Sequence, residues 1–82
     1  MKLPRDLSGE ELAQSLRQYG YRVTRQTGSH MRLSSNSKGV EHHITVPGHK
    51  QIKIGTLAGI LADVARYLEI AREDLAQQLF DR

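Results

Sequence analysis

The spacing of the apolar residues changes twice along this chain, and that change limits the folds that the chain can adopt. Apolar residues recur every three or four positions from Leu12 to Tyr19, alternate with polar ones in the segments between Tyr21 and Val46, and regain the helical spacing from Leu57 to Leu68. Helical spacing is typical of amphipathic helices, whereas alternation is typical of strands with one buried face. The sequence therefore predicts a helix, a group of strands and a second helix, in that order.

The first helix carries signals at both ends. Ser8 and Glu11 have the spacing of a capping box, in which each side chain bonds the backbone N–H of the other residue. Leu7 and Leu12 have the spacing of a hydrophobic staple. Gly20 stands where a left-handed residue often ends a helix. We expect this helix to span about residues 8–19.

Three strands are expected in the middle of the chain, separated by a turn at residues 27–28 and by the polar loop 34–39. Their alternation predicts one inner face, formed by Tyr21, Val23, Met31, Leu33, Val40, His42, Ile44 and Val46. The fold class is therefore α+β with the order α-β-β-β-α. Its three-stranded antiparallel sheet buries one face against both main helices and leaves the other face open.

The second main helix is expected to begin with Thr56 as its N-cap. A short additional helix is expected over about residues 72–80, after Ala71, which is a poor capping residue. Residues 1–82 are predicted to form a single small domain. A chain of this size buries only about 60% of its unfolded surface, which leaves little room for an enclosed substrate cavity.

Positive charge is concentrated in the middle of the chain. Residues 17–53 contain seven lysines and arginines against the single acidic residue Glu41, whereas both flanking segments are net acidic. All four histidines lie in the same segment. Such a block is either a binding surface for a phosphate backbone or simply a solvated basic face.

Several classes of protein do not fit the composition. The chain has no cysteine, which excludes disulfides and thiolate zinc sites. The stretch from Leu57 to Leu68 is too short to span a bilayer and contains Asp63 and Arg66. The first residues do not form the pattern of a signal peptide. We expect a cytoplasmic protein without a small-molecule cofactor.

His30 is the residue best suited to catalysis. Alternation places His30 and Arg32 together on the open sheet face, at the start of a strand beside the turn at Gly28. An imidazole can move a proton near neutral pH, and nearby cations can stabilise a charged phosphate in a transition state. Gly28 would allow close approach of the backbone to a ligand. Taken alone, however, a histidine on a sheet surface is more often structural or inert.

The other histidines leave the second proton-transfer group open. His42 and His43 are adjacent in a strand, so they face opposite sides and cannot both bind one metal ion. We expect no metal site. Water, His42 or His49 could each assist His30. Lys50 and Lys53, in the basic connection after the third strand, are candidate substrate contacts together with Gly28, Ser29 and Arg32.

Three short motifs occur in a characteristic order: Gly28-Ser29-His30, Val46-Pro47-Gly48-His49 and Gly55-Thr56-Leu57. With this order, the chain resembles the HicA family of mRNA interferase toxins from about Ser8 to Phe80. The resemblance implies a fold similar to that of a double-stranded-RNA-binding domain. It also implies metal-independent cleavage of mRNA that depends on His30.

The resemblance further implies a partner, a HicB-type antitoxin that binds the toxin as a hetero-oligomer and masks His30. Two other functions remain compatible with the residues. One is a non-catalytic RNA-binding module, which a basic surface and this fold would suit. The other is a degenerate toxin kept for antitoxin binding or regulation, although the intact Gly28-Ser29-His30 motif argues against it.

Overall fold

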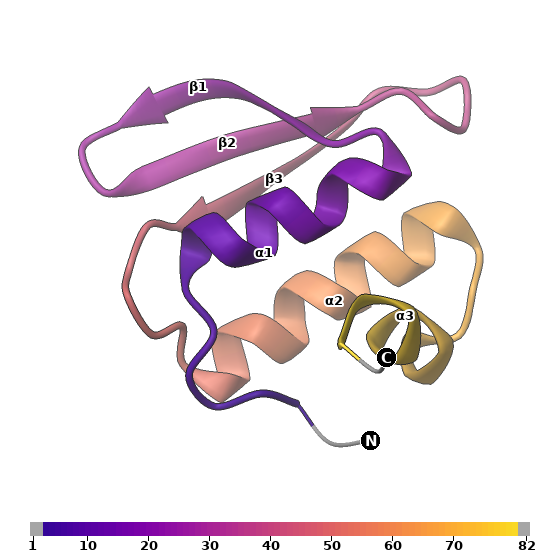
Figure 1. The fold of residues 1–82 in the computed structure, drawn as a ribbon. Helices are drawn as coiled ribbons and strands as arrows, with labels where there is room; N and C mark the ends of the chain where they lie inside the picture. The colour runs from indigo at the N-terminus through magenta and orange to yellow at the C-terminus, as the bar shows by residue number, and fades with distance from the viewer. Residues whose placement is uncertain (1–2, 81–82) are drawn as a thin grey trace.

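The computed structural model describes residues 3–80 and contains three α-helices, a short 3-10 helix and three strands (Figure 1). In chain order these are α1 (Gly9–Ser15), η1 (Leu16–Tyr19), β1 (Arg22–Thr27), β2 (His30–Ser35), β3 (His42–Pro47), α2 (Ile54–Leu68) and α3 (Arg72–Phe80). The predicted α+β class and the α-β-β-β-α order, followed by a short C-terminal helix, are confirmed.

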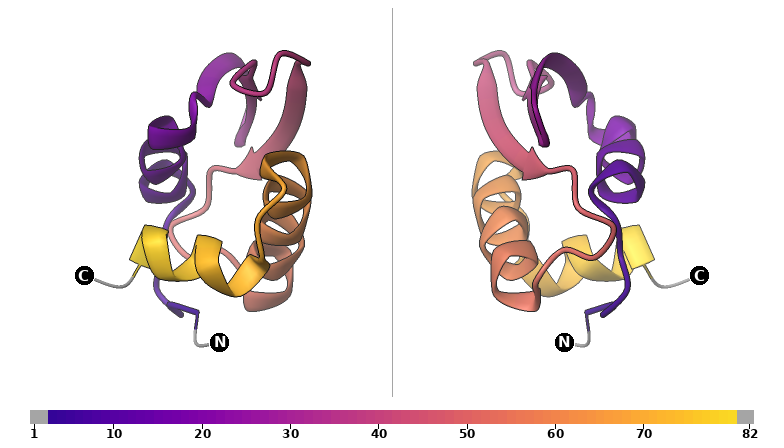
Figure 2. Two further views of the ribbon diagram at one scale, coloured as in Figure 1. Left: turned by 90° about the vertical axis from the view of Figure 1, so that its right-hand side faces the viewer. Right: turned by 90° about the vertical axis from the view of Figure 1, so that its left-hand side faces the viewer.

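The three strands form one antiparallel sheet in the order β1-β2-β3, which makes β2 the central strand (Figure 1). The helices all lie on one side of the sheet, and α3 crosses beneath α1 and α2 on the side away from the strands (Figure 2). The other sheet face is open, as the alternation of polar residues on β2 predicts. Within residues 3–80, no helix is long and apolar enough to cross a membrane.

The core lies between the sheet and the helices. Its completely buried side chains come from α1, η1, β2, β3, α2, α3 and two connecting segments, and include Leu12, Leu16, Tyr21, Leu33, Val46, Leu57, Leu61, Val64 and Leu75. Each large aliphatic side chain removed from water contributes about 1.5–3 kcal/mol to folding. This shared core fixes the position of β2, the strand that begins with His30.

The predicted boundaries of the first helix are confirmed. The Ser8 side chain accepts a hydrogen bond from the Glu11 N–H at 3.0 Å, and the Glu11 carboxylate accepts one from the Ser8 N–H at 2.9 Å. Gly20 ends the helical segment with a left-handed φ of 85°. The last four helical residues form the tighter 3-10 turn η1 rather than continuing the α-helix.

Two inner-face predictions are wrong. Val23 is 48% exposed because the helices pack against the opposite edge strand, β3, and cover β1 less, and Val40 is 70% exposed because it lies in the loop before β3 begins at His42. The remaining apolar residues of the predicted inner face are buried, and His42 is partly buried.

The predicted start of the second main helix is also wrong. Helix α2 begins at Ile54 with Lys53 at the N-cap, and no side chain caps it. Thr56 therefore lies within the first turn rather than before it. The short helix α3 begins at Arg72 and ends at Phe80, as predicted.

Candidate active site on the open sheet face

A tight turn presents His30 at the first position of β2. Thr27 pairs with His30, so Gly28 and Ser29 form a two-residue loop between the strands. Gly28 has a φ of 56° and the φ of Ser29 is not positive. These signs match a type II′ hairpin turn, which favours glycine at its first central position. The positive φ of Gly28 thus allows the tight turn that places His30 of the Gly28-Ser29-His30 motif at the start of β2.

Two glycines allow other segments to pack closely around this turn. The Gly48 N–H donates a hydrogen bond to the Ser29 carbonyl, and a Cβ at Gly48 would lie 2.8 Å from that oxygen. The Gly9 N–H donates to the His49 carbonyl at 2.9 Å, and a Cβ at Gly9 would overlap the Pro47 carbonyl. The His30 turn, the end of β3 and the start of α1 are therefore held together by close backbone contacts.

The His30 side chain is exposed on the open face. Its cross-strand partner is Pro47, and it makes no hydrogen bond or ion pair within residues 3–80. The core neighbour Met31 faces the opposite side of the sheet and is 5% exposed. A ligand on the open face can therefore reach the imidazole, which the fold does not use for its own stability.

A β-bulge adds a second arginine to this face. The pairing of β1 with β2 shifts between Val23, opposite Leu33, and Arg25, opposite Arg32. In a regular strand Val23 and Arg25 would share the inner face, but the extra residue at the bulge turns Arg25 outward. Neither Arg25 nor Arg32 makes an ion pair within the part of the chain that the structure describes. Two opposed cations without a carboxylate form an anion-binding surface.

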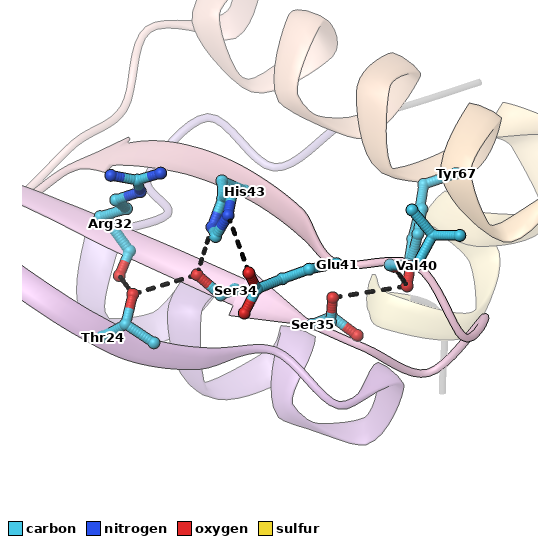
Figure 3. Close-up of polar contacts among 8 residues, drawn as sticks. All are labelled: Thr24, Arg32, Ser34, Ser35, Val40, Glu41, His43 and Tyr67. Carbon is cyan, nitrogen blue, oxygen red and sulfur yellow. Dashed lines mark hydrogen bonds and ion pairs between the residues drawn. The ribbon is translucent and has the colours of Figure 1, made fainter.

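A polar network lies beside Arg32 on the same face (Figure 3). The Ser34 hydroxyl is 2.6 Å from Nδ1 of His43 and 3.0 Å from the Thr24 hydroxyl. Nε2 of His43 lies 3.3 Å from the Glu41 carboxylate. With Glu41 accepting from Nε2–H, Nδ1 can accept from the Ser34 hydroxyl, so both ring nitrogens have partners. The network fixes the orientation of the imidazole.

The structure brings together four of the predicted site residues: Gly28, Ser29, His30 and Arg32. Lys50 and Lys53 are exposed on the connection between β3 and α2, which leaves the sheet and runs toward the start of α2 (Figure 1). They therefore lie outside the open face.

The fold places the two candidate partners of His30 in proton transfer, His42 and His49, in different parts of the molecule. His42 faces the helices, where its Nδ1 is 2.7 Å from the Tyr21 hydroxyl and its Nε2 is 3.3 Å from Asp63. It pairs with Ser35 at the far end of β2 and is excluded as a second group at His30. His49 follows Gly48, the residue bonded to Ser29. Residues 3–80 contain no group of three His, Asp or Glu side chains that could hold a metal ion.

Sequence reasoning missed Arg25 and the network of Thr24, Ser34, Glu41 and His43 as site residues. Regular alternation assigns Arg25 to the inner face, and only the bulge contradicts it. The connection of Glu41 and His43 to Ser34 depends on the pairing register of β2 with β3. Adjacent His and Glu residues in a basic segment were the available signal.

Residues 9–65 match the family described as the HicA toxin of bacterial toxin-antitoxin. This match covers more than half of the 82 residues. The chain belongs to the HicA toxin family. No curated protein and no solved structure matches it. The matched segment of this HicA toxin contains α1, the whole sheet and most of α2, and so includes every residue of the open face described above.

Proposed function

We propose that this HicA toxin is an endoribonuclease that cleaves mRNA without a metal cofactor, with His30 as its catalytic residue. The observation that carries the proposal is the exposed imidazole of His30 on the face that also presents Arg25 and Arg32. Family membership supports the toxin role, and the resemblance described above supports RNA as the substrate.

The chemistry assigned to His30 is proton transfer during attack by the ribose 2′-hydroxyl. As a base, the imidazole takes the hydroxyl proton while the 2′-oxygen bonds to phosphorus and the bond to the 5′-oxygen breaks. The products are a 2′,3′-cyclic phosphate and a 5′-hydroxyl, whose proton comes from a second group, either water or His49. Arg25 and Arg32 stabilise the negative charge that develops on the phosphate oxygens.

Several features of the site suit RNA better than a small substrate. The face is open and exposed, so an extended strand can lie across it. Gly28 and Ser29 bring backbone close to the position where a phosphate would meet His30. Lys50 and Lys53 would add contacts to the RNA backbone beyond the sheet.

We also propose that a HicB-type antitoxin covers the open face and masks His30, and that the toxin acts in the cytoplasm, where its mRNA substrate lies. The antitoxin would compete with RNA for Arg25 and Arg32. Saturating antitoxin is expected to abolish both RNA binding and cleavage, and a ternary complex of toxin, antitoxin and RNA with normal cleavage would contradict this part of the proposal.

The test compares the wild type with His30→Ala and with a control, Gln77→Ala, an exposed residue on α3. Because the His30 side chain makes no hydrogen bond within residues 3–80, His30→Ala is expected to melt at the wild-type temperature. It is expected to lose RNA cleavage and growth inhibition by at least 100-fold, a typical contribution of general acid–base catalysis. Gln77→Ala should keep both. Unchanged cleavage by His30→Ala would contradict the assignment.

The same assay distinguishes the alternative functions. Wild-type cleavage should continue in excess chelator, and loss of cleavage would contradict metal independence. Salt-sensitive RNA binding with no product after long incubation would instead identify a non-catalytic RNA-binding module. Binding of antitoxin with neither cleavage nor RNA binding would identify a degenerate toxin.

A further inference from the structure

A hollow lies between the β3 edge of the sheet and α2. Its volume is about 520 Å³, within the range of cavities that hold small ligands. Four of its lining residues come from the strands and four from α2, and the polar or small ones among them are Arg32, His43, Thr45, Thr56, Gly59 and Asp63. We call this feature the β3–α2 hollow.

The β3–α2 hollow is adjacent to the proposed catalytic residue. Arg32, which lines it, is two residues from His30 on the same strand and on the same face. Two residues of a strand span roughly 7 Å. Thr45, also in the lining, is the cross-strand partner of Arg32. A strand of RNA with its phosphate at His30 would therefore bring a neighbouring nucleotide to the hollow.

The sheet side of the hollow provides a fixed aromatic ring. The His43 side chain is 39% exposed, and its two ring nitrogens are held by Ser34 and Glu41. The ring can therefore offer a face to a ligand without rotating. Figure 3 shows the Arg32 guanidinium beside this ring. Aromatic rings and arginine planes are the groups on which proteins stack unpaired RNA bases.

The helix side of the hollow provides space and polar groups. A Cβ at Gly59 would have no atom within 4 Å, so the helix surface is open there. The Thr56 hydroxyl can donate and accept hydrogen bonds. Asp63 uses its Oδ1 for His42 and Arg66, and no contact within residues 3–80 uses its Oδ2. This combination can bond the edge of a base.

We propose that the β3–α2 hollow binds one nucleobase of single-stranded RNA, next to the phosphate cleaved at His30. Arg32 and His43 stack on the base, and Thr56 and Asp63 bond its edge. The inference rests on the proposed ribonuclease function and adds to it a site for substrate recognition. Asp63 accepts hydrogen bonds, so the hollow should prefer bases that carry an amino group over uracil.

The test uses DNA oligonucleotides that contain a single ribonucleotide, which fixes the one bond that can be cleaved. An abasic residue is then placed at each position in turn. For the wild type, one abasic position next to the ribonucleotide should raise KM about tenfold with little change in kcat. The remaining abasic positions should have small effects.

Two matched variants of α2 locate this effect. Gly59→Leu places a side chain in the hollow, and Gly55→Leu makes the same change at an exposed position that does not line it. Neither site has atoms within 4 Å of an added Cβ, so both variants should fold. A leucine at position 55 also leans toward the helix N-terminus, away from the hollow.

Gly59→Leu is expected to raise KM about tenfold for the intact oligonucleotide and to remove the effect of the abasic position. Gly55→Leu should behave as the wild type. Two results would contradict base binding in the β3–α2 hollow while leaving cleavage established. One is equal KM at all abasic positions, and the other is a Gly59→Leu variant that retains the positional effect. A Gly59→Leu variant that is defective only in antitoxin binding would contradict it as well.

Failure of the ribonuclease proposal gives a different result. If the wild type cleaves no RNA at all, the proposed function fails. Fluorescence anisotropy then measures the affinity of the protein for the same oligonucleotides and so tests base binding in the hollow. Loss of affinity at one abasic position in the wild type, absent in Gly59→Leu, would still support the base site. No position dependence would overturn it.

Discussion

Arg25 and Arg32 stand directly opposite one another on the open face, next to the strand position of His30. Like charges at opposed strand positions destabilise a sheet by roughly 0.2–1 kcal/mol. A bound phosphate removes this repulsion. The pair therefore lowers the stability of the free protein and raises its affinity for an anion, which is the behaviour expected of a binding site.

Substitution of either arginine should separate stability from binding. Arg25→Ala and Arg32→Ala are each expected to leave the melting temperature unchanged or slightly higher, and to weaken RNA binding. Each should reduce the slope of log affinity against log salt by about 0.7 for a single strand. Arg72→Ala, on the acidic first turn of α3, is the control. A lower melting temperature with an unchanged salt slope would show that the pair is structural.

Glu11 acts at the same scale through its capping hydrogen bonds. The bonds from the Ser8 N–H and hydroxyl lower the pKa of the Glu11 carboxyl below 4.5. Its contribution to stability is therefore present above the unfolded pKa and is lost as pH falls through the folded value. The difference in denaturant midpoint between wild type and Glu11→Gln should be largest near neutral pH and vanish once the pH lies below the folded pKa of Glu11. A constant difference across this range would exclude the carboxylate as the cause.

At the scale of the elements, close packing between segments holds the turn before His30 in place. The start of α1, the end of β3 and the β1–β2 turn meet at Gly9 and Gly48, where no side chain fits. These contacts explain how two motifs that are separated in the sequence come to lie next to one another in the fold. The Pro47-Gly48 segment supports the turn that carries His30.

Gly48→Ala is expected to destabilise the protein by about 1–3 kcal/mol, the usual cost of forcing a methyl group into packed structure. It should also displace Ser29 and reduce cleavage. Gly59→Ala is the control and should instead raise the free energy of unfolding. Its methyl group meets no atom within 4 Å, and alanine favours a helix over glycine by about 1 kcal/mol. Chemical denaturation measures both. Equal midpoints for the two variants would contradict the packing argument.

At the scale of the whole molecule, His42 connects the sheet to the helices. Its imidazole bonds the Tyr21 hydroxyl and Asp63, and it stacks on Tyr67 with ring centroids 4.6 Å apart. Burial, with Tyr67 and Asp63 nearby, raises the pKa of Tyr21, so its hydroxyl stays protonated in the folded protein. Tyr67 in turn accepts from the Lys38 N–H and donates to the Val40 carbonyl, which secures the β2–β3 loop on α2 (Figure 3).

Tyr21→Phe should lower the free energy of unfolding by about 1 kcal/mol, because it removes the hydroxyl from a partly buried bond. RNA cleavage should be unchanged, since the Tyr21 side chain lies on the face opposite His30 and does not line the β3–α2 hollow. Thermal or chemical denaturation measures the first effect, and the oligonucleotide assay the second. A cleavage defect in a fully folded Tyr21→Phe variant would connect the two faces and contradict this separation.

The sequence by itself determined the order of the elements and indicated His30 as the candidate catalytic residue. Local spacing was sufficient for the capping box at Ser8 and Glu11 and for the alternation that exposes His30 and Arg32, because both depend on residues a few positions apart. The match of three short motifs added the family. The wrong start of α2 at Thr56 shows the limit of local capping signals where no side chain caps the helix.

Only the tertiary structure decided which residues share the site. Arg25 faces outward because of a bulge in the pairing of β1 with β2, and alternation within β1 alone gives the opposite result. The β3–α2 hollow exists because α2 packs against β3, which places Gly59 near His43. Strand register and helix packing depend on contacts between residues far apart in the chain, so they are set by the shared core rather than by any local pattern.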